Sequence, residues 1–394
     1  MCAEIPDYKD TLKLPKTDFP MRAGLPKREP EWLAKWENIK VYDTLRQKKS
    51  RSSFILHDGP PYANGHLHIG HALNKILKDM VVRSQQMMGK DARYIPGWDC
   101  HGLPIEWKIE EQYRSKGKNK DDVDIIDFRQ ECRKFAAGWV ETQREEFKRL
   151  GVLGKWENPY LTMDFHAERV IAEEFMKFLM NGTLYQGSKP VMWSPVEKTA
   201  LAEAEIEYHD HKSHTIWVAF KIKNASAEIS KARIVIWTTT PWTIPSNRAI
   251  AFNPKISYGL YHVDETSEES WTAEGDYYII ADNLASETLE KSRVTKHTRV
   301  KDVLSSELKD CVCQHPFSEL DSFWSYDVPV IDGDHVTDDA GTGFVHTAPS
   351  HGADDYECFL KRNWLDRMTH NVGEERDFLA HVPFCAGLTV FDRL

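Results

Sequence analysis

The alternation of hydrophobic and polar positions divides the chain into two parts with different periodicities. In the first part, an apolar run at residues 54–56 precedes a turn rich in Gly and Pro, and apolar positions at helical spacing follow at residues 73–81. A longer helical pattern covers residues 128–150. This alternation predicts an α/β domain over residues 49–186, in which crossover helices connect parallel strands.

The second part, from about residue 187 to 394, contains short strand-like runs separated by turn residues. Such runs indicate a β-barrel or a sandwich. Residues 1–48 form a separate N-terminal segment, which is rich in turn residues until an amphipathic helix begins after Pro30. The strand-like runs are residues 215–222, 233–237, 257–263 and 277–280.

Composition limits the possible function classes. The 394 residues are 41% hydrophobic and 28% charged, which is enough for two or three globular units and excludes a disordered chain. The net charge of −10 excludes general nucleic-acid binding through bulk positive charge, so any such contact must use local basic patches. The polar, acidic start and the lack of a long apolar run predict a cytoplasmic protein with no membrane partner.

The cysteines indicate neither a disulfide framework nor a structural metal site. There are seven of them, an odd number, and no two are spaced as in C-x-x-C. Cys311 and Cys313 are too close together for the usual zinc knuckle.

Two histidines mark the best candidate for a ligand site in the first part. His68 and His71 stand three residues apart at the predicted helix start, where free backbone N–H groups and the helix dipole favour a polyphosphate. Gly70 has no side chain, so a nucleotide can approach the backbone closely. Capping or surface roles are the alternative for an isolated pair, but the strand, Gly/Pro turn and helix around this pair favour an ATP site.

The sequence around this helix start resembles the class I aminoacyl-tRNA synthetases. The shared elements are His-Ile-Gly-His at residues 68–71, Asp-Gly-Pro-Pro-Tyr-Ala-Asn-Gly at 58–65 and Pro-Gly-Trp-Asp-Cys-His-Gly-Leu-Pro-Ile-Glu at 96–106. The last two are similar to the isoleucine enzymes. The resemblance implies the first half of a Rossmann-like parallel sheet and the activity of an isoleucine–tRNA ligase, which activates isoleucine with ATP and transfers it to tRNA(Ile). Simpler nucleotidyltransferases share a similar helix start but lack an inserted domain.

The resemblance also implies roles for individual residues in the synthetic site. His68 and His71 would donate hydrogen bonds to phosphate oxygens, while Mg²⁺ screens the charge of the ATP polyphosphate. Asp99 would pair with the α-ammonium of isoleucine, and Pro60 would form part of the side-chain pocket. A helix cap or a turn is the alternative role for Asp99. Cys100 has no neighbouring base in the sequence and is interpreted as structural.

Two motifs in the second part together resemble the editing domain of the isoleucine, valine and leucine synthetases. They are Trp-Thr-Thr-Thr-Pro-Trp-Thr-Ile-Pro-Ser-Asn at residues 237–247 and the stretch 341–356. Taken singly, the threonines fit ordinary β-propensity and Asp354 fits a helix N-cap. The resemblance implies that Asp355 holds the substrate α-amino group and orients the hydrolytic water, with His346 beside it. The residues implied to line the editing pocket are Thr238, Thr239, Thr240, Thr243, Asn247 and Asp355.

Fidelity explains why such a domain is needed. Isoleucine and valine differ by one methylene, worth about 1–3 kcal/mol in an apolar pocket, and this pair is the standard example of that limit. Binding alone cannot supply the required accuracy. A second site that admits only the smaller side chain and hydrolyses its ester removes Val-tRNA(Ile).

Departures from the family pattern leave three alternatives for the activity of the chain. The sequence to residue 394 contains no lysine-rich Lys-Met-Ser-Lys-Ser loop, so we expect the first half of the catalytic fold and an incomplete inserted domain. Residues 193–197 replace the cysteine pair of many bacterial relatives, which argues against zinc. The chain is then part of a monomeric ligase, a stand-alone aminoacyl-tRNA deacylase, or an inactive fragment that binds ATP or tRNA.

Overall fold

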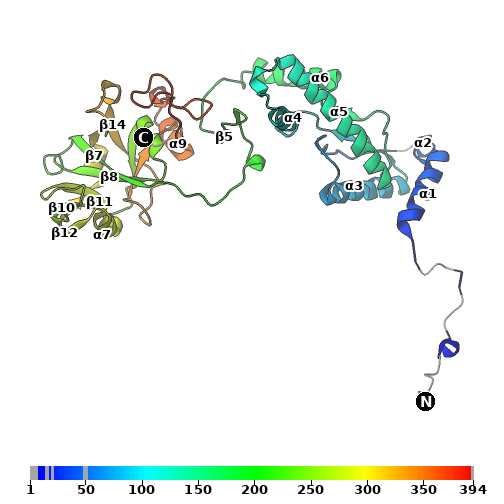
Figure 1. Cartoon of the computed structure of the whole chain (residues 1–394), viewed down its shortest axis with the longest axis horizontal. Helices are drawn as coiled ribbons and strands as arrows, with labels where there is room; N and C mark the ends of the chain where they lie inside the picture. Colours follow the sequence, from blue (N-terminus) through cyan, green and yellow to red (C-terminus); the bar gives the residue numbers. More distant parts are fainter. Residues whose placement is uncertain (1–7, 14–16, 19–21, 48–51, 392–394) are drawn as a thin grey trace. The chain divides into compact units, whose positions relative to one another are not determined.

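The computed structural model describes residues 8–13, 17–18, 22–47 and 52–391, which form two compact units (Figure 1). The units comprise Met1–Tyr185 and Gln186–Leu394, and their dividing point lies next to the domain boundary predicted at residue 187. Parts of the predicted N-terminal segment, residues 1–7, 14–16, 19–21 and 48, lie outside the described residues, as do 49–51 and 392–394. The functional roles predicted for the two parts stay predictions.

Unit 1 is mainly helical. The predicted helical patterns at 73–81 and 128–150 are confirmed as α3 and α5, and α4 packs against α5 (Figure 1). The helices of this unit are α1 (Leu25–Asn38), α2 (Val41–Arg46), α3 (Ile69–Met87), α4 (Leu103–Ser115), α5 (Ile125–Arg149) and α6 (Phe165–Met180).

The prediction that the first helix begins after Pro30 is wrong. Helix α1 starts at Leu25, and Pro30 lies inside it. Gly24 caps the helix in a left-handed conformation, with φ of 59°, and Pro26 occupies the first turn, where a missing N–H costs nothing. Pro30 therefore removes one backbone hydrogen bond without ending the helix.

The strands of unit 1 pair in parallel, as predicted. Strand β1 (Ser53–Ile55) pairs with β2 (Asp91–Arg93), and β3 (Gly97–Trp98) pairs with β4 (Tyr160–Leu161). A single parallel bridge joins Tyr62 to Asp99 and so connects the turn after β1 with the end of β3.

One buried glutamine holds this turn in place. The Gln143 side chain, on α5, is fully buried, and its Nε2 donates to the carbonyl oxygens of Tyr62 at 3.0 Å and Gly65 at 2.7 Å. Its Oε1 accepts from the Trp98 indole nitrogen at 2.9 Å. A helix in the core thereby fixes the loop that leads into α3.

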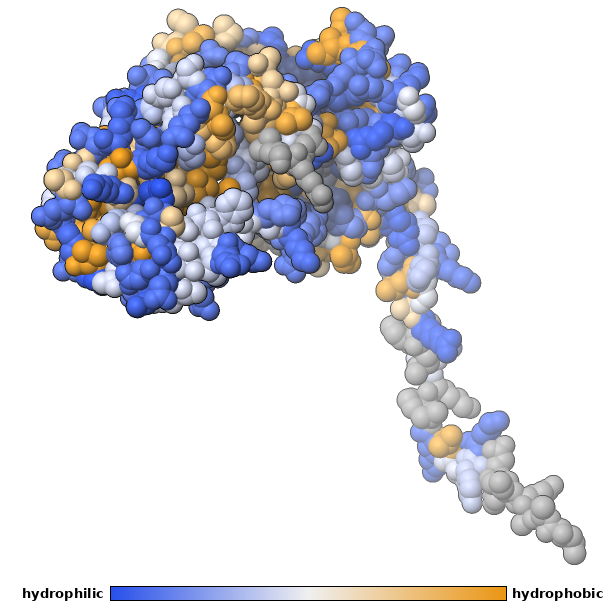
Figure 2. Space-filling view, turned by 60° about the vertical axis from the view of Figure 1, so that its left-hand side comes forward, coloured by the Kyte–Doolittle hydropathy of each residue, from blue (hydrophilic) through white to orange (hydrophobic). Residues whose placement is uncertain are grey.

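Two helices of unit 1 expose rows of apolar side chains. Figure 2 shows hydrophobic residues as orange patches in a largely hydrophilic surface. Contiguous apolar surface of this kind is typical of interaction sites. The exposed side chains include Leu73, Leu77, Met80 and Met87 on α3 and Phe165, Phe175, Phe178 and Met180 on α6.

Unit 2 is built on a nine-stranded mixed sheet with the order β12-β10-β11-β8-β7-β13-β14-β9-β15. Most neighbours are antiparallel, while β11–β8 and β14–β9 are parallel. The edge strand β15 also packs against β8, so the sheet curls on itself. Its strands are β7 (Ile216–Asn224), β8 (Arg233–Thr238), β9 (Ala249–Phe252), β10 (Tyr258–Thr266), β11 (Tyr277–Ala281), β12 (Val294–Val303), β13 (Val312–Gln314), β14 (Asp327–Asp332) and β15 (Phe344–Thr347).

Smaller elements complete unit 2. A two-stranded pair, β5 (Trp193–Ser194) and β6 (Thr199–Ala200), lies outside the large sheet. The helices are α7 (Asp282–Lys291), α8 (Ser305–Lys309) and α9 (Ala353–Leu360). The predicted α/β class with a β-rich second part is confirmed, and no helix among the described residues is long and apolar enough to cross a bilayer.

Replacing Gln143 should destabilise unit 1 specifically. In Gln143→Leu, the buried Trp98 indole and two partly buried backbone carbonyls lose their partner, so we expect the free energy of unfolding to fall by about 2–4 kcal/mol. This free energy of unfolding is measured by hydrogen exchange of the α5 amides at several urea concentrations, detected by mass spectrometry. Gln112→Leu, at an exposed position of α4, is the control and should change the value by less than about 0.5 kcal/mol. Equal effects of the two changes would contradict the role of Gln143.

Candidate functional site

The rings of the two predicted histidines lie side by side at the start of α3. His68 is the N-cap, and its Nδ1 accepts the Gly70 N–H at 3.1 Å, while the His68 N–H donates to Nδ1 of His71 at 3.3 Å. The two ring centroids are 3.8 Å apart. A Cβ at Gly70 would lie 2.9 Å from the His68 ring, so a larger residue here would displace that ring. Capping and a ligand role are therefore compatible here, since the Nε2 atoms of both rings take no part in the cap.

A positively charged cluster lies behind these histidines. The Asp58 carboxylate forms ion pairs with both Lys75 and Lys78 and accepts from the Tyr94 hydroxyl at 2.6 Å. One carboxylate facing two ammonium groups leaves a net positive charge at the helix start. Burial, His68 and Lys75 all lower the pKa of His71, so its ring is neutral near pH 7.

A cavity of about 270 Å³ opens at this helix start. Both predicted histidines line it, together with the turn that follows β1. The cavity therefore combines ring nitrogens, exposed backbone and nearby positive charge, the features that suit an anion. Its lining residues are Gly59, Pro61, His68, Gly70, His71, Asn74 and Lys75.

The predicted amino-acid site lies on the same turn. Asp99 exchanges backbone hydrogen bonds with Pro61 and Ala63, at 2.8 and 2.9 Å. Its Oδ1 accepts the His101 N–H at 3.2 Å and lies 3.4 Å from the Thr162 hydroxyl. A Cβ placed on Gly97, two residues earlier, would lie 3.5 Å from the Pro60 Cβ, so Pro60 and the start of β3 are adjacent.

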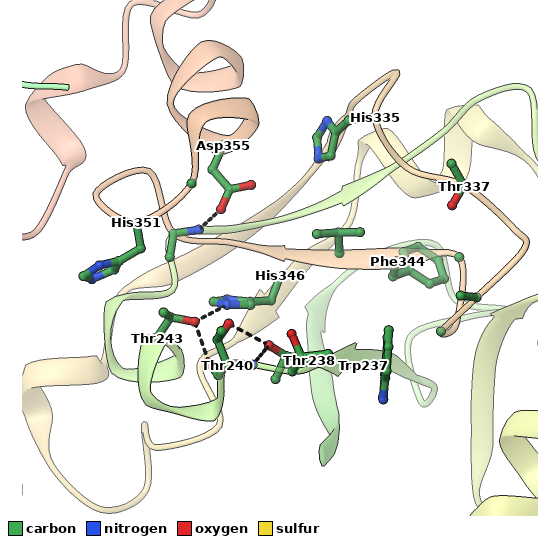
Figure 3. Close-up of a pocket in the computed structure, with 17 residues that line it drawn as sticks. Trp237, Thr238, Thr240, Thr243, His335, Thr337, Phe344, His346, His351 and Asp355 are labelled. Atoms are coloured by element: carbon green, nitrogen blue, oxygen red, sulfur yellow. Dashed lines mark hydrogen bonds between the residues drawn. The ribbon is translucent and has the colours of Figure 1, made fainter. Parts of the chain in front are cut away.

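Unit 2 contains a larger pocket of about 380 Å³, shown in Figure 3. The end of β8, strand β15 and the start of α9 form its walls. Six of the seven editing residues predicted from the sequence line it, and Asn247 lies behind the wall. The lining residues are Trp237, Thr238, Thr239, Thr240, Thr243, His335, Thr337, Ala340, Gly341, Gly343, Phe344, Val345, His346, Ala348, His351, Gly352 and Asp355.

His346 is held by hydrogen bonds to both ring nitrogens. Nε2 is 2.8 Å from the Thr243 hydroxyl (Figure 3). Nδ1 is 3.1 Å from the Asn247 amide nitrogen. Because the Asn247 amide also donates to the Ala249 carbonyl, it is a donor to Nδ1, and the ring proton belongs on Nε2. Thr243 in turn donates to the Thr240 carbonyl at 2.8 Å.

Asn247 donates a hydrogen bond to His346, which in turn donates to Thr243. Both ring nitrogens of His346 are therefore engaged, and neither is available to a substrate. Burial lowers the pKa of His346 to about 4, so the ring is neutral. The histidine therefore joins the 240–247 segment to β15.

Asp355 has the opposite character, because part of its carboxylate stays available. Oδ2 accepts the Ala348 N–H at 2.8 Å, while burial raises the pKa of the carboxyl group. Among the described residues no hydrogen bond or ion pair joins Asp355 to His346, and Figure 3 shows them on opposite sides of β15. The two residues therefore line one pocket without acting as a pair.

The threonine run likewise contains both paired and unpaired hydroxyl groups. Thr238 accepts the Thr240 N–H at 3.1 Å, and their hydroxyls are 3.3 Å apart. Thr239 is exposed on the pocket lining, and its hydroxyl makes no hydrogen bond to the described residues. It is the hydroxyl of the run best placed to meet a ligand.

Sequence reasoning missed several lining residues. His335 and Thr337 come from the turn after β14, which carries no recognisable motif, and the Nε2 atom of His335 is buried without a partner among the described residues. His351 stands inside the 341–356 motif but received no role; its Nε2 lies 3.3 Å from the Ser246 hydroxyl. Gly343 has φ of +78°, and a Cβ there would lie 2.3 Å from that of Ala281. Glycine is thus required beside the pocket.

The comparison with protein families assigns the chain. The model described as tRNA synthetases class I (I, L, M and V) matches residues 31–314, which is more than half of the sequence.

The chain belongs to the class I tRNA synthetases.

Curated relatives of this synthetase chain carry the name isoleucine–tRNA ligase. The protein of Ruegeria pomeroyi is 60% identical over 397 residues, covering 99% of this chain and 41% of the relative. That of Rhodopseudomonas palustris is 59% identical, covering 90% of this chain and 36% of the relative. The predicted family is confirmed, and the synthetase chain spans about two fifths of the length of these relatives.

Among solved structures, the ternary complex of an Agrobacterium radiobacter LeuRS with tRNA and LeuAMS is similar at 18% identity and a TM-score of 0.39. The match covers 86% of this synthetase chain and 44% of that one. No group of three or more His, Cys, Asp or Glu residues suited to a metal ion occurs in the part of the synthetase chain that the structure describes.

The buried histidines predict a steep loss of stability in acid. Burial lowers the pKa values of His315, His346 and His351 to about 4, below the ordinary value of 6.5. The unfolded chain binds protons near 6.5 and the folded chain does not, so the unfolding free energy of unit 2 should fall between pH 6.5 and 4. Each histidine contributes a slope of about 1.4 kcal/mol per pH unit.

Urea unfolding at several pH values measures this slope. His351→Asn should lower it by one proton, whereas replacing the exposed His211 with Asn should not. A slope unaffected by His351→Asn would show that this ring is protonated equally in both states.

Proposed function

We propose that the chain is part of an isoleucine–tRNA ligase, in which unit 1 takes part in isoleucine activation and unit 2 hydrolyses Val-tRNA(Ile). The observation that carries this proposal is the pocket of unit 2, where an available carboxylate and an available hydroxyl lie beside His346, whose two ring nitrogens are both paired. Relatives named isoleucine–tRNA ligase, which are longer than this chain, support the assignment.

Unit 1 supplies alignment and charge in the proposed activation step. The isoleucine carboxylate attacks the α-phosphorus of ATP, pyrophosphate leaves, and negative charge grows on the phosphate oxygens. The Nε2–H groups of His68 and His71 would donate to those oxygens, and the excess charge of Lys75 and Lys78 over Asp58 favours the anion. Class I synthetases generally use ATP with Mg²⁺. We propose that the polyphosphate charge at this site would be screened by Mg²⁺ brought with ATP.

Asp99 and Pro60 would bind isoleucine on the turn next to this site. The Asp99 carboxylate would pair with the α-ammonium, while the hydrogen bonds from His101 and Thr162 fix its orientation. The position of Pro60 against Gly97 supports a role as an apolar wall.

In unit 2, water would attack the ester carbonyl of Val-tRNA(Ile). The bond between the carbonyl carbon and the ribose oxygen breaks, and the ribose oxygen leaves with a proton that derives from the water. Asp355 would bind the substrate ammonium and orient the water, and Thr239 would contact the terminal adenosine. A positioning role for His346 fits its two engaged nitrogens better than proton transfer does.

The electrostatics of Asp355 support an ammonium ligand. Burial raises the pKa of this carboxyl group, so the charged form is destabilised while the pocket is empty. A substrate ammonium would compensate that cost, because a buried charge is stable when it is paired.

The two alternatives to a complete ligase are a stand-alone deacylase and an inactive chain that binds ATP or tRNA. The exposed apolar faces of α3 and α6 fit a protein whose remaining length packs on unit 1, which favours the ligase. The pocket of unit 2 is formed within that unit, which allows the chain alone to act as a deacylase. Binding of ATP or tRNA without turnover is the third case. The full-length ligase is proposed to act as a monomer on isoleucine, ATP and tRNA(Ile).

Deacylation tests the role of Asp355. The chain should hydrolyse Val-tRNA(Ile) faster than Ile-tRNA(Ile), and Asp355→Ala should lower kcat/KM at least about 100-fold, because both the ammonium contact and the water contact are lost. Release of labelled valine measures the rate. Asp355→Asn should lose activity as well yet gain stability at pH 7, since the neutral amide avoids the cost of the buried charge.

Asp354→Asn is the control for this test, because Asp354 is exposed and does not line the pocket. It should leave hydrolysis within about twofold of the unmodified chain. Wild-type hydrolysis that persists in Asp355→Ala would contradict the proposed site, and a folded chain with no hydrolysis at all would leave only the complete ligase or the inactive binder.

The phosphate role of His71 is tested in the chain extended to the full length of its relatives. His71→Ala should slow isoleucine-dependent pyrophosphate exchange by about 100-fold or more while changing the binding of isoleucine little, because the lost contact forms mainly in the transition state. His66→Ala, an exposed histidine that bonds to Glu146 outside the cavity, is the control. Equal losses in exchange and isoleucine binding would count against a phosphate contact.

A further inference from the structure

The segment that carries Thr243 of the pocket wall is held from behind by three aromatic side chains. This segment, η4 (Pro241–Ser246), follows the threonine run. His315 Nε2 lies 2.9 Å from the Ile244 carbonyl oxygen, and Trp324 Nε1 donates to the Pro245 carbonyl at 3.1 Å. The Tyr326 hydroxyl donates to the Asn247 carbonyl at 2.6 Å. We name His315, Trp324 and Tyr326 the aromatic clamp; all three come from residues 315–326, between β13 and β14.

Contacts within the clamp fix the orientation of its rings. His315 Nδ1 accepts the Phe317 N–H at 3.1 Å, so its Nε2 carries the proton and donates to Ile244. The His315 and Trp324 rings stack, with centroids 5.9 Å apart and planes 11° apart, and each residue is only 1% exposed. Side chains packed in this way have a single orientation available to them.

A second set of bonds supports the middle of the segment. Asn371 Nδ2 donates to the Pro245 carbonyl at 3.1 Å and to the Ser246 hydroxyl at 3.0 Å. The Pro245 carbonyl therefore has two donors, Trp324 and Asn371, whereas the Asn247 carbonyl has a single side-chain donor, Tyr326. Loss of the Tyr326 hydroxyl should therefore disturb the segment more than loss of the Trp324 donor.

The clamped segment sets one wall of the pocket. Thr243 lies within η4 and Asn247 follows it, and these two residues hold His346 from both sides. Movement of the Asn247 backbone would release Nδ1 of His346 and, through the ring, Thr243. The clamp residues do not line the pocket themselves.

Distinguishing side chains that differ by one methylene requires a wall fixed to about 0.5 Å. We propose that the aromatic clamp positions the η4 wall and thereby sets the upper size limit of the substrate side chain. His315, Trp324 and Tyr326 are positioning residues that never touch the substrate. This inference rests on the proposed hydrolysis of Val-tRNA(Ile) by unit 2.

Substitutions that remove a single donor test the clamp. Tyr326→Phe deletes only the hydroxyl and leaves the Asn247 carbonyl without its side-chain donor, and Trp324→Phe leaves the Pro245 carbonyl with Asn371. Tyr261→Phe is the matched control, because it removes a 2.7 Å hydroxyl bond to Asp282 in the same unit, away from the pocket. Thermal unfolding of all variants measures the general loss of stability.

The first measurement is the ratio of kcat/KM for Val-tRNA(Ile) to that for Ile-tRNA(Ile). Tyr326→Phe should lower this ratio about threefold to tenfold, mainly by increasing hydrolysis of the larger ester, and Trp324→Phe should lower it less. Tyr261→Phe should leave the ratio unchanged at a similar loss of stability. An unchanged ratio in Tyr326→Phe would overturn the proposal.

The second measurement needs no substrate. The ¹⁵N shifts of the His346 ring, assigned by the loss of its signals in His346→Asn, should show one tautomer with the proton on Nε2 in the wild type and a mixture in Tyr326→Phe. A ring that keeps its single tautomer in this variant would overturn the clamp. Absence of wild-type hydrolysis would instead overturn the proposed function, so the two failures are distinguishable.

Discussion

The pocket of unit 2 depends on one constraint, that a polar ring sealed from water must have both nitrogens paired. His346 meets it with Thr243 at Nε2 and Asn247 at Nδ1. These bonds join the turn after β8 to the edge strand β15, which is how segments distant in the sequence form one wall. A neutral histidine serves here because it both accepts and donates a hydrogen bond, which a protonated ring does not.

Beside this paired ring, the lining groups that the described residues leave without complete pairing, which include Nε2 of His335, identify where a ligand binds. Asp355 keeps part of its carboxylate available, and Thr239 keeps its hydroxyl. Unit 1 repeats the arrangement at a smaller scale, because His68 and His71 use only Nδ1 in the cap of α3. At both sites the structural hydrogen bonds among the described residues leave some polar groups unpaired, and those of Asp355, Thr239 and the two histidines face a cavity.

Local patterns in the sequence were sufficient for much of the fold. The apolar run at 54–56 and the periodicity at 73–81 predicted β1 and α3, because strand and helix periods are local properties. Pro30 misled the prediction of α1, since the helix continues through this proline at the cost of one backbone hydrogen bond. The threonine run was visible as a motif, whereas the clamp and His335 were not. Their roles depend on which carbonyl or cavity each side chain meets across the sheet, and no periodicity encodes that.

The proposed hydrolysis requires that unit 2 binds the aminoacylated end of a tRNA. A structure with a stable mimic of that end tests this requirement most directly. Adenosine carrying valine through an amide in place of the ester can be crystallised with the chain. We expect its ammonium within hydrogen-bonding distance of Asp355, its adenosine near Thr239, and His346 unchanged in its bonds to Thr243 and Asn247. A mimic bound elsewhere, or in the pocket with its ammonium directed away from Asp355, would contradict the account.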